Sequence, residues 1–386
     1  MKKINKVVHF DSDKKMITVQ AGITWKEIQD YLNPYDCAVK VMQFANLFTV
    51  GGSLSVNCNG IDPHVGPLIE SVRSIKMLSY DGSIITASRT ENAELFYLAI
   101  GGLGLFGVII EATFDVVENS IYKRETKRMC LHQYVQFLKN IPYDPTIGFH
   151  FAFLTLSLFS KQLFSDVVTF NFRTYDPSKL FQWQQKRVKK LYQEKRVKPR
   201  KLSTKMWSKS RLVKALHWVP VGMMHGRIVS RNNIMRPPAK HLYVETPGQT
   251  NLLQEYFIPI DNLIPFITSL EGITKKLNVN LMHVALRFIP QNRESFLSYT
   301  AIDRVGIVLF FNQEMNEQGN TQTRLWTQHL IDAATALNGV YYLPIQLHAD
   351  QQQIRTAYPS IDDFFVFKKQ YDPNELFMNH FYQKYA

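Results

Sequence analysis

Residues 48–57 read FTVGGSLSVN, and they combine two adjacent glycines with short polar side chains. A glycine has no Cβ, so the backbone can turn tightly or let a ligand approach its amides. Thr49, Ser53 and Ser55 add hydroxyl groups, and Asn57 adds an amide that both donates and accepts hydrogen bonds. These residue types suit an anionic ligand or a flat ligand with polar edges. An ordinary tight turn between strands is the alternative interpretation.

A second glycine-rich stretch, GGLGLFG at residues 101–107, satisfies the G-x-G-x-x-G pattern of dinucleotide-binding loops. In a Rossmann fold that pattern follows a strand and opens a helix, so that the helix N-terminus meets the pyrophosphate. Here the predicted order is reversed, because a helix over 91–99 precedes the glycines and a strand over 108–117 follows them. We therefore predict that this stretch is not a Rossmann site.

Bulk composition indicates a globular protein. The 386 residues are 45% hydrophobic and 13% aromatic, and this length allows two or three domains. Cys37, Cys58 and Cys130 are odd in number and lack CxxC spacing, which argues against a disulfide framework and favours a reducing compartment. The N-terminus has no long apolar run, and the run at 149–159 is shorter than the roughly 20 residues of a membrane span. We expect a cytoplasmic protein, with attachment at the membrane periphery as the alternative.

Capping and turn residues predict the elements around the first glycine stretch. Thr24 and Glu27 form a capping box that opens a helix over 25–32. Ser88 and Glu91 form a second capping box, which opens the helix over 91–99. The expected strands of this region are residues 4–8, 16–20, 72–78, 83–86 and 108–117, with the Asp81-Gly82 turn making a hairpin of the third and fourth.

The pattern changes after about residue 120. Longer strand-like runs appear, a basic segment and a proline-containing stretch interrupt them, and helices then alternate with strands. The expected strands are 147–159, 166–173, 252–260, 279–289, 306–311 and 340–343, and the expected helices are 262–277, 324–337 and the tail from 354, broken at Asp372-Pro373. The chain has no internal repeat and no low-complexity tract.

Five stretches together resemble a family of flavoproteins. FTVGGSLSVN, NGIDPHVGPL, SVRSIKMLSYDG, ENAELFYLAIGGLGLFGVI and the terminal KKQYDPNELFMNHFYQKY are similar to FAD-dependent oxidoreductases of the vanillyl-alcohol-oxidase type, which carry a PCMH-type FAD domain. Aldonolactone oxidases, alditol oxidases and the decaprenylphosphoryl-ribose oxidase are the relatives that the stretches resemble most. The resemblance runs from about Val7 to the C-terminus and is strongest over 16–117 and 339–386.

The resemblance implies an α+β fold in three parts that hold FAD through loops. Residues 1–119 would be the FAD-binding domain, N-terminally shortened. Residues 120–345 would form a cap or substrate domain with an antiparallel sheet flanked by helices. Residues 346–386 would be a tail that returns to the FAD side.

By position in the family, the cofactor contacts fall on main-chain amides that the glycines leave accessible, and on their neighbours. We assign no metal ligands. The implied FAD-binding residues are Thr49, Val50, Gly51, Gly52, Ser53, Ser55, Val56, Asn57, Cys58, Gly60, Gly104, Gly107, Val108 and Ile109.

The sequence departs from the family on the cofactor side. Relatives carry a further N-terminal stretch with a glycine-rich loop and often a histidine bonded to the flavin, whereas this chain begins at MKKINKVVHF. We therefore expect part of the FAD cradle and the covalent flavin link to be absent. Relatives usually read H-G-[KR] where this chain has Asn59-Gly60-Ile61. Asn59 can hydrogen bond beside the flavin but cannot exchange a proton near neutral pH.

The sequence also departs on the substrate side. Sugar-oxidising relatives use a Glu-x-Arg pair, and here Ala285 stands two residues before Arg287. The resemblance implies that Arg287 polarises a substrate oxygen or stabilises reduced flavin, without its carboxylate partner. The lysine of the ribose oxidases falls at Ile345. His348 is then the candidate base, and a purely structural histidine is the equal alternative. Lys368 and Lys369 are expected to cap the last long helix on a solvated face.

The implied reaction is oxidation of a CH–OH group by hydride transfer to flavin N5, with removal of the hydroxyl proton. The implied substrate is a small sugar-derived molecule such as an aldonolactone, alditol or polyol. Oxygen or another acceptor would then take the electrons. The alternative is a degenerate family member with little or no FAD that acts as a binding or membrane-surface protein, because incomplete sites rarely catalyse.

One segment carries nearly all of the net charge of +13. Residues 186–214 contain thirteen Lys or Arg and one acid, Glu194, which gives the segment +12. Trp183, Tyr192 and Trp207 lie among these cations. A solvated helix face is the plain interpretation, and an anionic membrane surface is the alternative. Nucleic acid would use the same charge, but no nucleic-acid module accompanies it, so we expect none.

Overall fold

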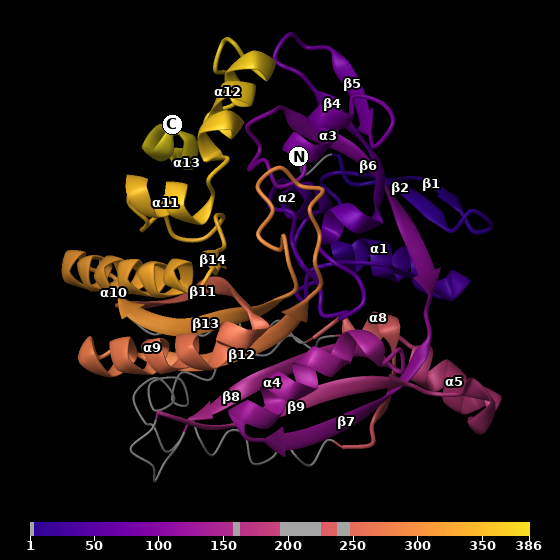
Figure 1. Ribbon diagram of the computed structural model, residues 1–386. Coiled ribbons are helices and arrows are strands. Elements are labelled where there is room, and N and C mark those ends of the chain that lie inside the picture. The colour runs from indigo at the N-terminus through magenta and orange to yellow at the C-terminus, as the bar shows by residue number, and fades with distance from the viewer. Residues whose placement is uncertain (1–3, 157–162, 194–224, 238–247) are drawn as a thin grey trace.

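The computed structural model describes residues 4–156, 163–193, 225–237 and 248–386 (Figure 1). Two antiparallel sheets with packed helices make up the described chain, so the expected α+β class is confirmed. Most of the basic segment, residues 194–214, lies outside the described residues. In the described part, no helix is both long and apolar enough to cross a membrane.

The first sheet contains only strands that precede residue 119. Its order is β1-β2-β6-β4-β5, and β3 pairs with the far end of the long central strand β6. Three helices, α1, α2 and α3, accompany it. The bounds are β1 Val7–Asp11, β2 Met16–Gln20, α1 Trp25–Leu32, β3 Cys37–Val39, α2 Val50–Ser55, β4 Val72–Leu78, β5 Ile84–Ser88, α3 Ala93–Ala99 and β6 Val108–Glu118.

The capping residues predicted for α1 are confirmed, whereas those predicted for α3 do not cap it. The Thr24 hydroxyl accepts from the Glu27 amide, and the Glu27 carboxylate accepts from the Thr24 amide, so the first capping box is confirmed. Ser88 instead accepts from the amides of Thr90 and Glu91 in a turn, and α3 starts later, after Asn92. The glycine stretch does lie between α3 and β6, opposite to the Rossmann order.

The second sheet has eight strands in the order β10-β7-β9-β8-β12-β13-β11-β14. All of its described pairs are antiparallel. The bounds are β7 Ile121–Met129, α4 Leu131–Asn140, β8 Ile147–Leu156, β9 Phe164–Thr174, α5 Gln182–Lys189, β10 Ile228–Ser230, α8 Arg231–Ile234, β11 Gln249–Pro259, α9 Leu263–Lys276, β12 Leu281–Ile289, β13 Arg304–Glu314, α10 Glu317–Ala336 and β14 Val340–Tyr341.

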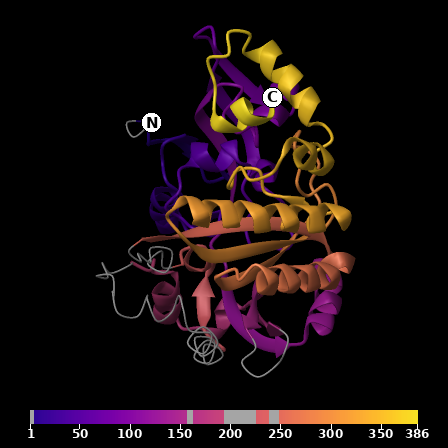
Figure 2. The ribbon, with the colours of Figure 1, turned by 90° about the vertical axis from the view of Figure 1, so that its left-hand side faces the viewer.

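Two long helices cover one face of this sheet. Helices α9 and α10 lie side by side over it (Figure 2). Tyr256 of β11 contacts Phe266 of α9, and Phe311 of β13 contacts Trp326 of α10, at ring-centroid distances of 5.5 and 4.7 Å. Because side chains alternate along a strand, the neighbours of Tyr256 in sequence point to the opposite face.

The last three helices pack against the first sheet domain, beside the loop that contains its second glycine stretch (Figure 1). They are α11 Gln351–Ala357, α12 Ile361–Tyr371 and α13 His380–Tyr385. The Tyr371 hydroxyl donates to Glu94 at 2.9 Å, and the Asn379 amide donates to the Leu103 carbonyl at 2.9 Å. The Phe364 and Phe106 rings lie 5.1 Å apart. The C-terminal helices therefore hold the loop that joins α3 to β6.

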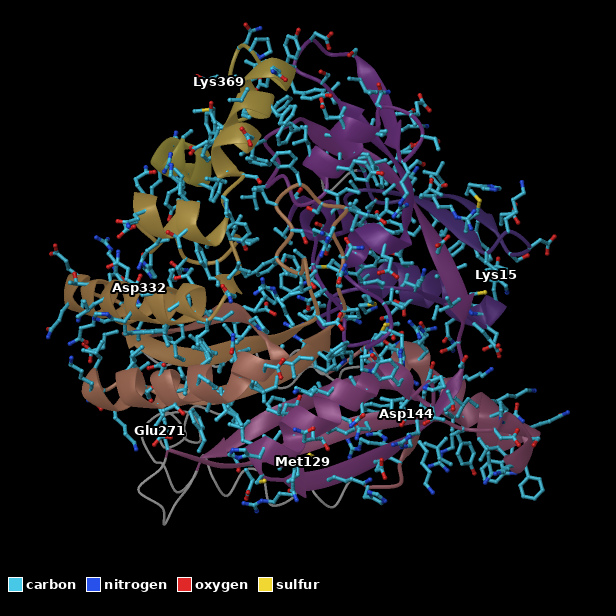
Figure 3. All side chains as sticks on the ribbon, viewed as in Figure 1. Lys15, Met129, Asp144, Glu271, Asp332 and Lys369 are labelled. Atoms are coloured by element: carbon cyan, nitrogen blue, oxygen red, sulfur yellow. The ribbon has the colours of Figure 1, made fainter. Side chains whose placement is uncertain are left out.

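One lysine of α12 contradicts the expectation of a solvated cap. The Lys368 side chain is fully buried and forms an ion pair with Asp372, which is also fully buried. Asp372 additionally accepts from the amides of Leu376 and Phe377. Lys369 is exposed, as expected, and lies on the outer surface (Figure 3).

The loop between β12 and β13 connects the two sheets. Glu294 forms an ion pair with Arg89 at 2.6 Å, and the Ser295 hydroxyl donates to the Ile100 carbonyl at 2.8 Å. The Tyr299 hydroxyl donates to the Asn57 carbonyl at 2.7 Å. Residues near the two glycine stretches are therefore fixed against this loop of the second sheet.

The glycine at position 102 is required by packing, which gives a testable prediction. A Cβ there would lie 2.1 Å from the Leu98 carbonyl and 2.9 Å from the Phe106 ring. Gly102→Ala should therefore lower the free energy of unfolding by about 3 kcal/mol in urea denaturation. Gly104→Ala is the control, since Gly104 has a φ of +77° but open space around it, and should cost only about 1 kcal/mol. Equal losses in the two variants would contradict the packing explanation.

Candidate functional site

The stretch that contains Gly51 and Gly52 is a short helix, α2, rather than an open loop. Thr49 is its N-cap, and its hydroxyl accepts the Gly52 amide. The amides of Val50, Gly51, Gly52 and Ser53 all have acceptors within the domain: the Ile23 carbonyl at 2.9 Å, the Ala21 carbonyl at 2.7 Å, the Thr49 hydroxyl at 3.3 Å and the Thr49 carbonyl at 3.0 Å. These amides are therefore not available to a phosphate, which corrects the prediction that they form the cradle.

The second glycine stretch is hydrogen bonded directly to α2. The Gly101 amide donates to the Leu54 carbonyl at 2.9 Å, and the Leu103 amide donates to the Ser55 carbonyl at 2.8 Å. A Cβ on Gly107 would lie 2.7 Å from the Leu78 carbonyl. Gly107 thus permits the close approach of β4 and β6, where Val108 and Ile109 are paired with Leu78 and Met77. Gly104 is exposed.

A run of main-chain amides without acceptors begins just after α2. In the described residues, the amides of Asn59, Gly60, Ile61 and Asp62 have no hydrogen-bond acceptor. The run lies between the two sheets, because the Ile61 carbonyl accepts from His150 of β8 at 2.8 Å. Four successive donors at a domain junction suit an anionic or polar-edged ligand.

Side chains beside this run are buried and already hydrogen bonded. The Trp25 indole donates to the Ser53 hydroxyl at 2.8 Å, and Ser53 donates to Gln43 at 2.5 Å. Burial raises the pKa of the Cys58 thiol to about 12, so Cys58 is a neutral thiol at physiological pH. Asn57, at a φ of 44°, accepts the Ile69 amide at 3.0 Å.

Arg287 has a carboxylate partner, contrary to the expectation from the missing Glu-x-Arg pair. Its guanidinium donates to Glu255 Oε1 at 2.9 Å, and the two side chains are 16% and 9% exposed. Arg287 is on β12 and Glu255 on β11, so the pair spans the strand between them, β13.

A glycine on β13 makes this crossing feasible. Gly306 is directly opposite Arg287 in the β12–β13 register. A Cβ at Gly306 would lie 3.3 Å from Glu255 Oε1 and 2.8 Å from the Ile289 side chain. A larger residue at position 306 would therefore crowd both the ion pair and its neighbour.

The ion pair lies on the sheet face opposite α9 and α10, close to groups at the junction with the first domain. Its charges contribute to the electrostatics of Cys58, Tyr299 and Tyr342. Burial raises the pKa of both tyrosines well above the usual range, so they remain protonated donors. Tyr299 donates to the Asn57 carbonyl, and Tyr342 donates to the Val56 carbonyl at 2.8 Å. The Asn59 side chain lies close enough to Tyr299 to act against that rise in pKa.

Comparison with known proteins bears directly on the first sheet. Residues 1–88 match the family model described as an FAD binding domain. The chain carries an FAD-binding domain. The match includes α2 and the amide run of residues 59–62.

Curated relatives match stretches of between 117 and 157 residues. L-galactono-1,4-lactone dehydrogenase of Arabidopsis thaliana is 31% identical over 157 residues, covering 37% of this chain and 26% of the relative. L-gulonolactone oxidase of Mus musculus is 30% identical over 117 residues, covering 30% and 27%. Cytokinin dehydrogenase 2 of Arabidopsis thaliana is 32% identical over 133 residues, covering 33% and 26%. The matched region thus spans about a quarter of the length of these relatives.

The structure allows a test of which residues fit FAD, whose diphosphate and ring edges need hydrogen-bond donors. The amides of residues 50–53 do not fit, because each already has an acceptor. The amides of Asn59 to Asp62 do fit, and Gly60 is half-exposed. These residues, with the Asn59 side chain, would hold FAD in the FAD-binding domain, and Arg287 faces the same junction from the second sheet. The roles of the other assigned cofactor residues stay predictions.

His348 is not brought to this junction. Its carbonyl accepts from Gln328 of α10, and the charges that act on its ring are those of Arg324 and Lys384. Burial, followed by these two cations, lowers the pKa of His348 to about 4. The structure therefore does not bring His348 to the Arg287–Glu255 pair. Its Nε2 is buried without a hydrogen-bond partner among the described residues, so a satisfied structural role is not shown either.

The sequence reasoning misses Glu255, Tyr299 and Tyr342 at the junction, and His283 on the same strand face as Arg287. His283 could have been found from period-two alternation, because it shares a strand face with Ala285 and Arg287. Its ring stacks on Phe310 at 4.8 Å. Glu255, Tyr299 and Tyr342 come from other strands and loops, and no local spacing connects them to Arg287.

Proposed function

We propose that this chain is an FAD-dependent oxidoreductase that oxidises a CH–OH group of a small sugar-derived substrate, of the aldonolactone, alditol or polyol class. The observation that carries the proposal is the buried Arg287–Glu255 pair facing the amide run of the FAD-binding domain. Relatives named as lactone dehydrogenase and lactone oxidase support the substrate class.

The residues have distinct roles in this proposal. When bound, FAD supplies the acceptor for the hydride. Arg287 donates to the substrate oxygen that becomes negatively charged as its proton leaves, and its fixed charge stabilises that oxygen. Glu255 Oε1 holds the guanidinium in place, and the Glu255 carboxylate accepts the hydroxyl proton. Tyr299 and Tyr342 keep the FAD-binding domain in register with this sheet face through Asn57 and Val56.

The experiment is anaerobic mixing of the FAD-loaded full chain with a panel of aldonolactones and alditols. At least one member should bleach the flavin absorbance, and oxygen or an artificial acceptor should restore it. The control is the same lactone with all its hydroxyls methylated, which has no CH–OH group to oxidise. A chain that binds FAD yet is bleached by none of the panel would contradict the substrate class. A chain that does not bind FAD would favour the degenerate alternative.

A further inference from the structure

Helix α5 projects from the body of the molecule at the side of the second sheet (Figure 1). Phe181, at its N-cap, is 72% exposed, and Trp183 is 60% exposed. Two exposed aromatic rings at one end of a helix form an apolar patch, and such a patch is a candidate contact surface. The proposed oxidoreductase function uses neither residue.

The exposed side of α5 joins an aromatic residue to three cations. Trp183, Lys186, Arg187 and Lys190 recur at spacings of three and four residues, so they lie along one face of the helix, and all four are exposed. The chain has no acidic residue between 177 and 193. Lys189 is paired with Asp36, whereas Lys186, Arg187 and Lys190 have no ion-pair partner among the described residues.

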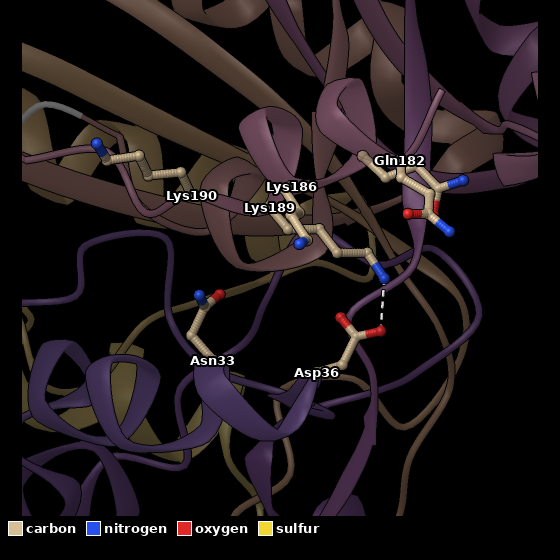
Figure 4. Close-up of a pocket in the computed structure, with 7 residues that line it drawn as sticks. Asn33, Asp36, Gln182, Lys186, Lys189 and Lys190 are labelled. Atoms are coloured by element: carbon tan, nitrogen blue, oxygen red, sulfur yellow. Dashed lines mark hydrogen bonds and ion pairs between the residues drawn. The ribbon is translucent and has the colours of Figure 1, made fainter. Parts of the chain in front are cut away.

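A polar pocket lies beside the same helix (Figure 4). Its volume is about 530 Å³. Amide side chains and ammonium groups line it, opposed by one carboxylate: Asn33, Asp36, Gln182, Gln185, Lys186, Lys189 and Lys190. Such a lining suits a phosphate group, which takes hydrogen bonds from amides and charge from ammonium groups.

We propose that α5 docks this protein on an anionic lipid surface, with Phe181 and Trp183 entering the interfacial region and the cations contacting phosphate headgroups. The exposed Trp183 ring shares one helix face with the cations, and the exposed Phe181 ring lies at the start of the same helix. This arrangement favours lipid over free phosphate, because a free phosphate leaves the rings without a role. This inference is independent of the proposed oxidation chemistry. It rests on described residues alone and uses none from 194–224.

Vesicle flotation of the full chain tests the proposal. The protein should float with phosphatidylcholine vesicles containing phosphatidylserine at low salt, less so at high salt, and not with phosphatidylcholine alone. The variant Lys186→Gln/Arg187→Gln/Lys190→Gln should lose about 100-fold in partitioning, at about fivefold per cation. Phe181→Ala/Trp183→Ala should lose about tenfold or more. Circular dichroism should show that both variants remain folded.

Two control variants test whether a loss of flotation is specific to α5 or follows from removing any exposed cations or apolar side chains. Lys276→Gln/Arg324→Gln/Lys369→Gln removes the same number and types of exposed cations from other helices, and Tyr143→Ala/Leu376→Ala removes exposed apolar side chains elsewhere. Both controls should float like the unmodified chain. Flotation that the α5 variants leave unchanged would overturn the proposal. The proposal would also be overturned if the protein did not float with vesicles but bound single-stranded DNA in a gel-shift assay in the same buffer. That result would indicate a nucleic-acid surface instead.

Discussion

Replacing Arg287 by alanine is expected to lower kcat/KM for the best sugar-derived substrate by about 10²–10³-fold, while FAD affinity changes little. The reason is that Arg287 is the charged donor on the sheet face that meets the FAD-binding domain, at 2.9 Å from Glu255. Steady-state rates with the best substrate of the panel, together with an FAD titration of each variant, provide the measurement.

Stability must be separated from chemistry here, because removing one partner leaves a buried charge on the other. The double variant Arg287→Met/Glu255→Gln removes both charges. It should have a urea midpoint of unfolding close to that of the unmodified chain, yet show no activity. Arg287→Lys keeps the charge but loses the planar donor, and should recover only part of the rate. Arg324→Ala, at an exposed arginine of α10, is the matched control and should keep full activity. A fully active Arg287→Ala variant would refute this site.

Replacing Asp372 by alanine should destabilise the protein by about 3–5 kcal/mol, because it leaves the fully buried Lys368 charge without a partner. Lys368→Met should cost less, since Asp372 would retain the Leu376 and Phe377 amides as donors. Urea denaturation of both variants gives the comparison. Lys369→Met, one residue away and exposed, is the control and should be nearly neutral. Equal and small losses in the free energy of unfolding for the Asp372, Lys368 and Lys369 variants would contradict a buried ion pair.

The same pair predicts a pH dependence. Burial alone raises the pKa of Asp372, but the hydrogen bonds from Lys368, Phe377 and Leu376 outweigh it and lower the pKa below the usual 3.8. A carboxyl whose folded pKa is lowered stabilises the protein above its unfolded pKa, and that stabilisation is lost as the pH falls through the folded pKa. The stability difference between the unmodified chain and Asp372→Asn should therefore shrink as the pH is lowered from about 5 toward 2.

Local chemistry accounts for most of the elements that the sequence could predict. The Thr24–Glu27 capping box, the hairpin at Asp81-Gly82 and the end of α12 before Pro373 all depend on residues within a few positions of each other. The Ser88–Glu91 pattern failed as a helix start because the Ser88 hydroxyl serves a turn instead. A short motif allows both outcomes, and only packing decides between them.

The site could be predicted less well, because its hydrogen bonds are long-range. Nothing in VGGS shows that Ala21 and Ile23 supply acceptors to its amides from nearly 30 residues earlier. Nor does spacing connect Arg287 to Glu255, which requires the register of three strands and the absence of a side chain at Gly306. Lysine is usually solvated, which predicts an exposed Lys368. Its i,i+4 spacing is compatible with the Asp372 pair, but only the fold buries both side chains.

An FAD titration that compares two added negative charges tests the central claim most directly. Asn59→Asp places a carboxylate beside the amide run of residues 59–62, and Gly52→Asp places one at the exposed start of α2. We predict that the full chain binds FAD, that Asn59→Asp weakens binding at least about tenfold, and that Gly52→Asp leaves it within twofold. No binding by the unmodified chain, or weakening by Gly52→Asp with Asn59→Asp unchanged, would contradict the account.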